Sequence, residues 1–402
     1  MTHITKLSSL FIGISFSLRL HTPIAFGICI FTGILLMLFD NKQNIKKWLV
    51  KGYKHKVFPL FCISFICILI SSIISNYPSR SFPVFIYLIA FMLFSYFIFC
   101  NFRNKPESLI LLIKFLFLSV CFSTILVFSY NINQIESIFE PIKEVRKYKG
   151  FVNLLTVLVF LCPLIEKCIE RKKIFFSYFL IPLIFPLAFI SNCNSAFLGL
   201  IGGFITLLFF ELLRLVKNKK NRVLILLSVL FFSSVTFLNI IPKYDKNSPI
   251  SEIDFLVPTN IIDAHRQIMW AFTKSELKEN LIFGIGPDTS NFIEESQKEI
   301  GHNQTGTMFY ISSHPHNFFL EILLEIGVFG TVSFLLLILF VIIYFLNKYY
   351  NPFARYLIFF NGYFWTASMV NFSFWSAWWQ GSYFLIQAIL FAIIYNKHNR
   401  CL

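Results

Sequence analysis

Long apolar segments alternate with short polar breaks along most of the chain. A helix needs roughly 20 apolar residues to cross a hydrocarbon core about 30 Å thick. The pattern therefore predicts an all-α polytopic membrane protein with about 12 transmembrane helices. The predicted spans lie near residues 7–20, 23–39, 57–75, 82–100, 108–130, 151–165, 174–190, 195–213, 223–242, 318–346, 355–372 and 380–396. Arg19 and Pro23 interrupt the first two, so a single re-entrant hairpin is an alternative there.

The longest polar stretch covers residues 243–317 and holds 10 of the 20 acidic residues against six basic ones. It is too polar to cross a membrane and long enough to fold, so we expect one long, partly helical loop. This loop divides the chain into an N-terminal bundle of about nine spans, residues 1–242, and C-terminal transmembrane helices, residues 318–402.

Basic residues are distributed unevenly between the predicted loops, and cytoplasmic loops normally carry the excess. One set of loops holds 22 of the 35 Lys and Arg residues, the opposite set holds 12, and Lys114 lies within a span. Both termini are therefore predicted to be cytoplasmic and the long loop to lie outside. The same asymmetry accounts for the net charge of +15 without a nucleic-acid partner.

Cysteine usage and the N-terminal segment add two further expectations. Eight of the nine cysteines fall in or beside apolar segments, which favours packing over a disulfide framework or a zinc site. No small-x-small cleavage site follows an apolar core near the N-terminus, so a cleaved signal peptide is not expected.

A histidine pair ends the long loop, in the run SSHPHN at residues 312–317. Histidine has the side-chain pKa nearest neutrality, so an imidazole here can accept a proton from a hydroxyl group. Pro315 favours an extended backbone, in which the rings of His314 and His316 point the same way. A metal-binding H-x-H pair and a solvated pair without function are the alternatives. Asn317 is suited to cap the helix that follows.

Residues 263–280 have the pattern of an amphipathic helix within the loop. Arg266 and Trp270 share a face at i, i+4 spacing, so the indole can hold the guanidinium as a fixed fork for a phosphate. A plain surface arginine is the alternative. Residues 283–288 form a turn by their glycine and proline content, which alone is no evidence of phosphate binding.

A shorter outer loop carries the basic residues Arg146, Lys147 and Lys149. Beside a membrane such a cluster attracts an anionic lipid headgroup. A solvated run of charges explains it equally well.

Residues 314–330 continue the histidine motif as HPHNFFLEILLEIGVFG. This run resembles the signature of the O-antigen ligase family, which includes related O-antigen polymerases. The loop arginine Arg266 with its aromatic Trp270, the glycine-rich turn and the long outer loop before a late span are also similar. The motifs occupy about 80 residues, although the general layout covers most of the chain.

The resemblance implies that His316 is the catalytic base and that Arg266 binds the donor diphosphate, with His314, Asn317 and Glu321 in supporting roles. One position departs from the family pattern. The family often has a second arginine in an S-R-S-A run, where this chain has CNSA with Asn194 in the arginine's place. An amide donates hydrogen bonds to phosphate but carries no charge. Either Arg146, Lys147 or Lys149 then supplies that charge, or the activity differs.

The implied reaction is a metal-independent transfer of a glycan from undecaprenyl diphosphate to a sugar hydroxyl of a lipid A core. It takes place on the periplasmic side of the bacterial inner membrane, as a step of lipopolysaccharide biosynthesis, and requires no cofactor. A polymerase that joins lipid-linked repeats differs only in its acceptor. A non-enzymatic flippase or exporter would need ionisable residues deep in the spans, and Lys114 is nearly the only clear one. A receptor or structural protein is the remaining alternative.

Overall fold

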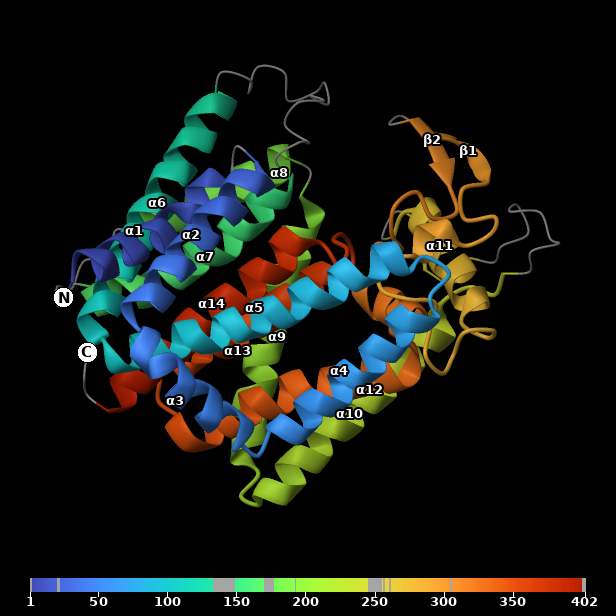
Figure 1. The fold of residues 1–402 in the computed structure, drawn as a ribbon. Coiled ribbons are helices and arrows are strands. Elements are labelled where there is room, and N and C mark those ends of the chain that lie inside the picture. Colours follow the sequence, from blue (N-terminus) through green and yellow to red (C-terminus); the bar gives the residue numbers. More distant parts are fainter. Residues whose placement is uncertain are drawn as a thin grey trace.

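The helical architecture is given by a computed structural model, which describes residues 2–19, 22–132, 149–169, 177–191, 193–244, 255, 257–259, 262–303 and 306–399. The helices are α1 (His3–Leu18), α2 (Pro23–Asp40), α3 (Lys42–Tyr53), α4 (Phe58–Ile74), α5 (Pro78–Asn104), α6 (Pro106–Ile132), α7 (Lys149–Ile169), α8 (Ser177–Ile190), α9 (Asn194–Leu215), α10 (Lys219–Ile240), α11 (Ala264–Glu276), α12 (Phe318–Tyr349), α13 (Ala354–Ser368) and α14 (Ala377–His398). Two short strands, β1 (Glu299–Asn303) and β2 (Gly306–Phe309), lie between α11 and α12 (Figure 1).

Each of the twelve predicted spans overlaps a helix, but their number as membrane spans is not confirmed. Within the described residues, eight helices are long and apolar enough to cross a bilayer. A ninth span results if α3 and α4, which meet at 88°, are counted as one broken span. The other predicted spans correspond to α1, α8 and α13, which have 16, 14 and 15 residues and are short for a full crossing.

Two elements were missed by the hydrophobic pattern. Helix α3 occupies a lysine-rich stretch that we expected to be a polar break, because its apolar face is short and only Trp48 in it is buried. The strands β1 and β2 pair antiparallel and form the one departure from an all-α fold in the described residues. Gly301 and Gly306 take φ values of 135° and 129° there, a conformation that favours glycine.

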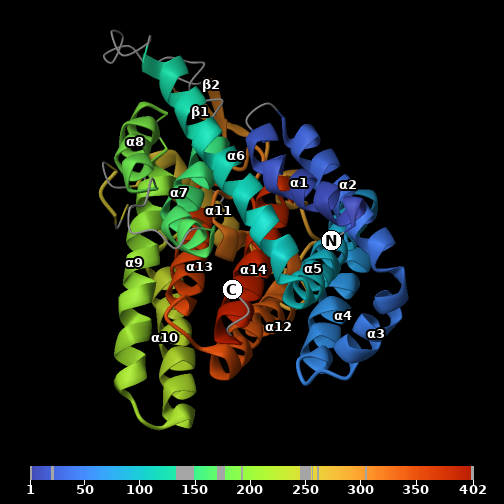
Figure 2. The same ribbon diagram turned by 90° about the vertical axis from the view of Figure 1, so that its left-hand side faces the viewer.

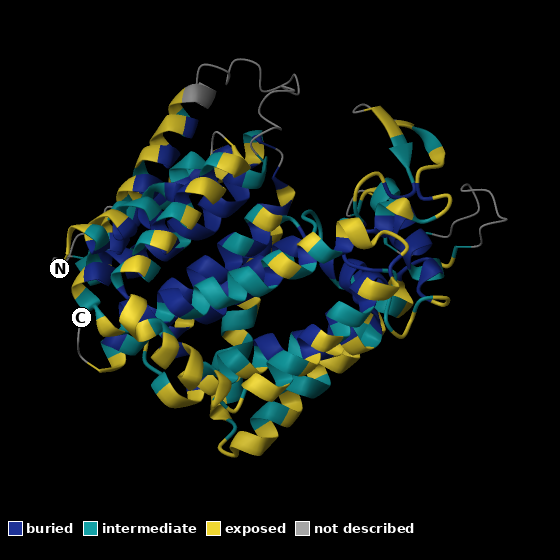
Figure 3. Ribbon diagram, viewed as in Figure 1, coloured by how far each residue is buried: buried dark blue, intermediate teal, exposed yellow. Residues whose placement is uncertain are grey.

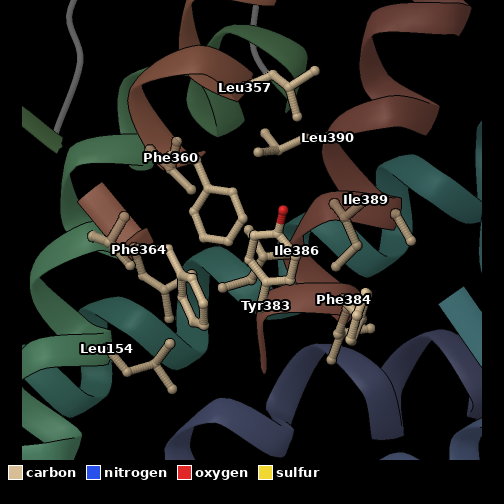
Figure 4. Close-up of a cluster of buried hydrophobic side chains, with 14 of the residues drawn as sticks. Leu154, Leu357, Phe360, Phe364, Tyr383, Phe384, Ile386, Ile389 and Leu390 are labelled. Atoms are coloured by element: carbon tan, nitrogen blue, oxygen red, sulfur yellow. The ribbon is translucent and has the colours of Figure 1, made fainter. Parts of the chain in front are cut away.

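The helices pack through large aromatic side chains and close glycine contacts. Figure 2 shows α9 beside α13. Helix α9 lies directly against α13, because a side chain at Gly202 would meet Thr366 Oγ1 at 1.9 Å. Small residues allow such backbone approach between membrane helices. Between α7, α13 and α14, Phe360, Phe364 and Tyr383 stack in a buried cluster (Figure 4). These contacts fix α13 and α14 and therefore the turn that joins them.

Helix α10 is the least enclosed element, and none of its residues is buried (Figure 3). A groove of about 680 Å³ runs along its apolar side, between Leu224 and Ile240. At the end of this groove, Phe237 contacts Trp270 of α11 and Phe319 of α12, with ring centroids 5.8 and 6.2 Å apart. The apolar side of α10 thus extends to a residue that contacts α11 of the long loop.

Helix α12 is interrupted at Gly327, which has φ 65° and ψ −177°. The interruption frees backbone groups that bind the preceding loop. Ile285 and Gly286 donate their N–H groups to the carbonyls of Leu324 and Glu325, at 3.1 and 2.8 Å. A side chain at Gly327 would lie 2.2 Å from the carbonyl oxygen of Ile282, so the close approach requires glycine. The loop is therefore fastened to the first turns of α12.

Candidate functional site

The histidine motif lies directly before α12 and is held by its cap. Asn317 accepts a hydrogen bond from the Leu320 N–H at 3.1 Å and donates to the Met369 carbonyl at 3.0 Å. This confirms the predicted N-cap. The preceding residue, His316, has φ 52°, an uncommon conformation for a residue with a side chain. The cap and the turn together give the imidazole a fixed direction.

Both histidines bind the same backbone carbonyl, that of Asn371 in the turn between α13 and α14. His316 approaches it through Nδ1 at 2.6 Å and His314 through Nε2 at 2.9 Å. A carbonyl oxygen only accepts hydrogen bonds, so these nitrogens carry the protons. The Nε2 of His316 is then the acceptor nitrogen and has no hydrogen bond from the described residues, while the Nδ1 of His314 lies 2.9 Å from Ser313 Oγ. Such an arrangement suits His316 to take up a proton.

The electrostatic environment keeps both imidazoles neutral. Burial lowers the pKa of His316 to about 3, and the neighbouring His314 and Arg266 add to that lowering, against the hydrogen bond to Asn371. Burial also lowers the pKa of His314; its bond to Asn371 opposes this and the charge of Arg266 reinforces it. The guanidinium of Arg266 is thus close enough to act on both rings. Burial lowers the pKa of Arg266 as well.

Helix α11 brings Arg266 to the histidines. Asp263 caps this helix by accepting the N–H of His265 at 2.8 Å, as its position in the predicted helix suggested. The expected stacking of Trp270 on Arg266 is wrong. Trp270 turns inward, is 5% exposed, and donates its Nε1–H to the Pro315 carbonyl at 3.0 Å. The indole therefore supports the histidine loop.

Two buried glutamates at the start of α12 hold the loops around the site. Glu321 accepts hydrogen bonds from Ser373 Oγ at 2.5 Å and from the Phe374 N–H at 2.6 Å. Glu321 does not orient His316 directly, but it fixes the turn that carries the Asn371 carbonyl. Glu325 accepts the N–H groups of residues 288–290 at 2.6, 3.2 and 2.9 Å.

The remaining predicted site residues are placed less centrally. Asn194 is exposed at the first position of α9. Its neighbour Ser195 accepts hydrogen bonds from the side-chain amides of Asn153 and Asn371, at 2.8 and 3.0 Å, and so ties α7 and α9 to the histidine-bearing turn. Arg146 and Lys147 lie outside the described residues.

Sequence reasoning missed Asn371, Ser195 and Asn153. A single asparagine carbonyl between two helices carries no pattern in the sequence, so only the fold could identify it. In the described part of the chain, no three His, Cys, Asp or Glu side chains gather as a metal ion would require.

Comparison with known proteins identifies related sequences. Residues 178–335 match the sequence profile of the family described as O-antigen ligase. A Rickettsia felis protein named "Putative polysaccharide ligase" is 30% identical over 205 residues, which cover 50% of this chain and 47% of that protein. A Rickettsia prowazekii protein with a name of the same form is 28% identical over 207 residues, with coverages of 50% and 48%. The chain thus matches about half the length of these curated relatives. No solved structure matches it significantly.

Proposed function

Since the chain carries an O-antigen ligase family domain, we propose that it transfers a glycan from undecaprenyl diphosphate to a sugar hydroxyl of a lipid A core. His316, in the loop of residues 243–317, is the general base. One observation carries this proposal: His316 donates a hydrogen bond from Nδ1 to the Asn371 carbonyl, which leaves its Nε2 as the acceptor. A positioned base contributes roughly a hundred- to ten-thousandfold in rate.

Arg266 is proposed to bind the diphosphate of the donor. Its charge acts on the ring of His316, and both groups are desolvated, which strengthens their interaction with an anion. A bound diphosphate would also raise the pKa of His316, because negative charge favours the protonated imidazole. The donor thereby makes the base stronger when it is needed. The departing diphosphate keeps its charge next to Arg266.

The polyprenyl chain of the donor is proposed to lie in the groove along α10. This groove is lined largely by apolar side chains of one helix and ends at Phe237, which packs on Trp270. Trp270 in turn supports Pro315, between the two histidines. A chain bound there would leave its diphosphate beside Arg266. Continuity with the histidine loop favours this groove as the binding site.

The location proposed for the reaction is the periplasmic face of the bacterial inner membrane. The uneven distribution of lysine and arginine supports cytoplasmic termini and an outer position for the loop. The donor already contains a diphosphate leaving group, so the proposed transfer needs neither a nucleotide nor a metal ion for activation.

The test incubates the purified protein in detergent with an undecaprenyl-diphosphate glycan and a lipid A core acceptor, and resolves products by mass. Glycan on the lipid A core is the expected product. Doubled repeats on the lipid carrier would instead identify a polymerase, and no transfer with either acceptor would contradict an enzymatic role.

Variants then test the assigned base. His316→Ala should lower the transfer rate at saturating donor about a hundredfold or more while donor affinity stays near that of the wild type. His302→Ala is the matched control, since His302 is an exposed histidine of the same loop. Wild-type transfer by His316→Ala would overturn the assignment.

A further inference from the structure

Arg19 is a partly buried cation at the end of α1 that the proposed mechanism does not use. Its guanidinium carbon lies 4.0 Å from the centroid of the Trp378 ring, at the start of α14. Its Nη2 lies 3.1 Å from the position that a side chain at Gly150 would occupy. The absence of a side chain at Gly150 thus leaves room for the guanidinium between α7 and α14.

One nitrogen of Arg19 lacks a hydrogen-bond partner within the described residues. Its Nε is buried without a hydrogen-bond partner, and no acidic side chain of the described residues forms an ion pair with it. Of the three other arginines that lie over aromatic rings, Arg80 pairs with Asp288 at 2.8 Å and Arg214 with Glu211 at 3.0 Å. Arg103 lies over Phe99 and Tyr395 and forms no ion pair within the described residues. A desolvated charge without a counterion is unfavourable, so the position of Arg19 favours binding of an anion.

Arg19 lies at the same end of the helices as His316. Gly150 precedes Asn153 by three residues on α7, which puts the two on one face about 5–6 Å apart. Asn153 shares the hydroxyl of Ser195 with Asn371, whose carbonyl binds both histidines. A second route is shorter, because Trp378 contacts Phe372, next to Asn371, with ring centroids 5.3 Å apart. Arg19 is therefore separated from the histidine pair by a few side-chain contacts.

We propose that Arg19 binds a phosphate group of a lipid substrate on the His316 side of the protein. A guanidinium offers pairs of parallel donors that match two phosphate oxygens. The face of the Trp378 ring holds the guanidinium of Arg19 in place. This inference rests on the proposed function, which supplies two sources of phosphate: the diphosphate of the donor and the phosphates of the lipid A core.

The proposed role of Arg19 also concerns Asn194, which stands where the family often has a second arginine. That residue is exposed at the start of α9 and contributes no charge, and the adjacent Ser195 belongs to the network that links Arg19 to Asn371. Arg19 supplies a positive charge to this part of the site from a different helix. Burial lowers the pKa of Arg19 to about 10, so it remains charged at neutral pH.

The experiment measures binding in nanodiscs, so that its result does not depend on transfer. The probes are undecaprenyl diphosphate, the lipid A core acceptor, and undecaprenol, which has the same chain and no phosphate. Arg19→Met keeps an apolar stem beside Trp378 but removes the charge. Arg19→Lys keeps the charge but not the fork. Arg214→Met, at an arginine with the same ring contact and a carboxylate partner, is the control.

We expect Arg19→Met to weaken binding of one phosphate-bearing lipid about tenfold to a hundredfold, as loss of charged hydrogen bonds implies, with undecaprenol unaffected. Arg19→Lys should lie between the wild type and Arg19→Met. A loss confined to undecaprenyl diphosphate identifies the donor, and one confined to the acceptor identifies the lipid A core.

Equal affinities of wild type and Arg19→Met for both phosphate lipids would overturn the proposal. So would an equal loss for undecaprenol, which would indicate a structural role. Should Arg19→Met not fold, the wild type still tests the inference. Chemical modification of Arg19 by phenylglyoxal should be suppressed by a phosphate-bearing lipid and not by undecaprenol. Loss of binding without any transfer activity in the wild type would support the phosphate site while contradicting the proposed reaction.

Discussion

Glu321→Ala tests whether the position of the Asn371 carbonyl governs the base. Glu321 is 1% exposed and binds Ser373 Oγ and the Phe374 N–H, two and three residues after Asn371. Alanine removes both acceptors and leaves a cavity beside the turn. The turn would then be free to move away from His316.

The magnitude follows from these two contacts. A hydrogen bond contributes about 0.5–1.5 kcal/mol between neutral groups and about 1.5–3 kcal/mol to a charged group, so loss of both destabilises the turn by roughly 1–6 kcal/mol. A displacement of about 1 Å in a catalytic group lowers a rate about a hundredfold. We expect Glu321→Ala to lower the maximal transfer rate by about that factor, with a smaller change in the KM for donor. Glu321→Gln should stay within about tenfold of wild type, because its amide can accept from Phe374 and donate to Ser373.

The assay is transfer to the lipid A core under saturating donor, resolved by mass, with thermal melting in the same detergent. Ser373→Ala is the matched variant that removes one of the two contacts, and its rate should be intermediate. An unchanged maximal rate in Glu321→Ala would refute the reasoning. A loss in Glu321→Gln as large as in Glu321→Ala would show that the charge matters and not the hydrogen bonds.

Three further predictions concern the base, the loop and the groove. The acidic limb of the kcat/KM profile should lie well below pH 6.5, because the lowered pKa of His316 keeps the base neutral there. The acidic limb of kcat should lie at higher pH, because the bound diphosphate raises the pKa of His316. A kcat/KM limb near pH 6.5 would contradict this. Gly327→Ala should lower the free energy of unfolding by about 3 kcal/mol, because the glycine has φ 65° and the new Cβ would lie 2.2 Å from the Ile282 carbonyl oxygen. The variant should therefore have a lower Tm, and an unchanged Tm would refute this prediction. Val229→Trp should raise the KM for undecaprenyl donors and not for short-chain donors if the groove binds the chain.

The sequence predicted the elements whose signals are local. Every predicted span overlaps a helix, and the predicted cap Asn317 makes the expected hydrogen bond. It also predicted a shared role for Arg266 and His316, and the two are close enough to interact electrostatically. The length of an apolar segment and the capping residue of a helix are properties of short segments, so they can be recognised from the sequence alone.

Features that depend on distant segments could not be predicted. Asn371 lies 55 residues after His316, and nothing in its neighbourhood distinguishes its carbonyl from others. Trp270 was expected on the surface of α11, but packing against Phe237 and the Pro315 carbonyl draws it inward. The number of spans is left open for a related reason, since apolar helices of 14–16 residues can end within the bundle and need not cross the membrane.

The first turns of α12 are what unite the candidate site. Glu321 and Glu325 are one turn apart in the chain but hold different loops: Glu321 fixes the turn after α13, and Glu325 fixes residues 288–290. Gly327 then interrupts the helix, and the freed carbonyls before it bind the same loop. Residues 318–326 thus act as a short rigid support that is joined to two loops and separated by a break from the remainder of α12. Changes beyond Gly327 should therefore affect membrane packing, whereas changes before it should alter the geometry of His316.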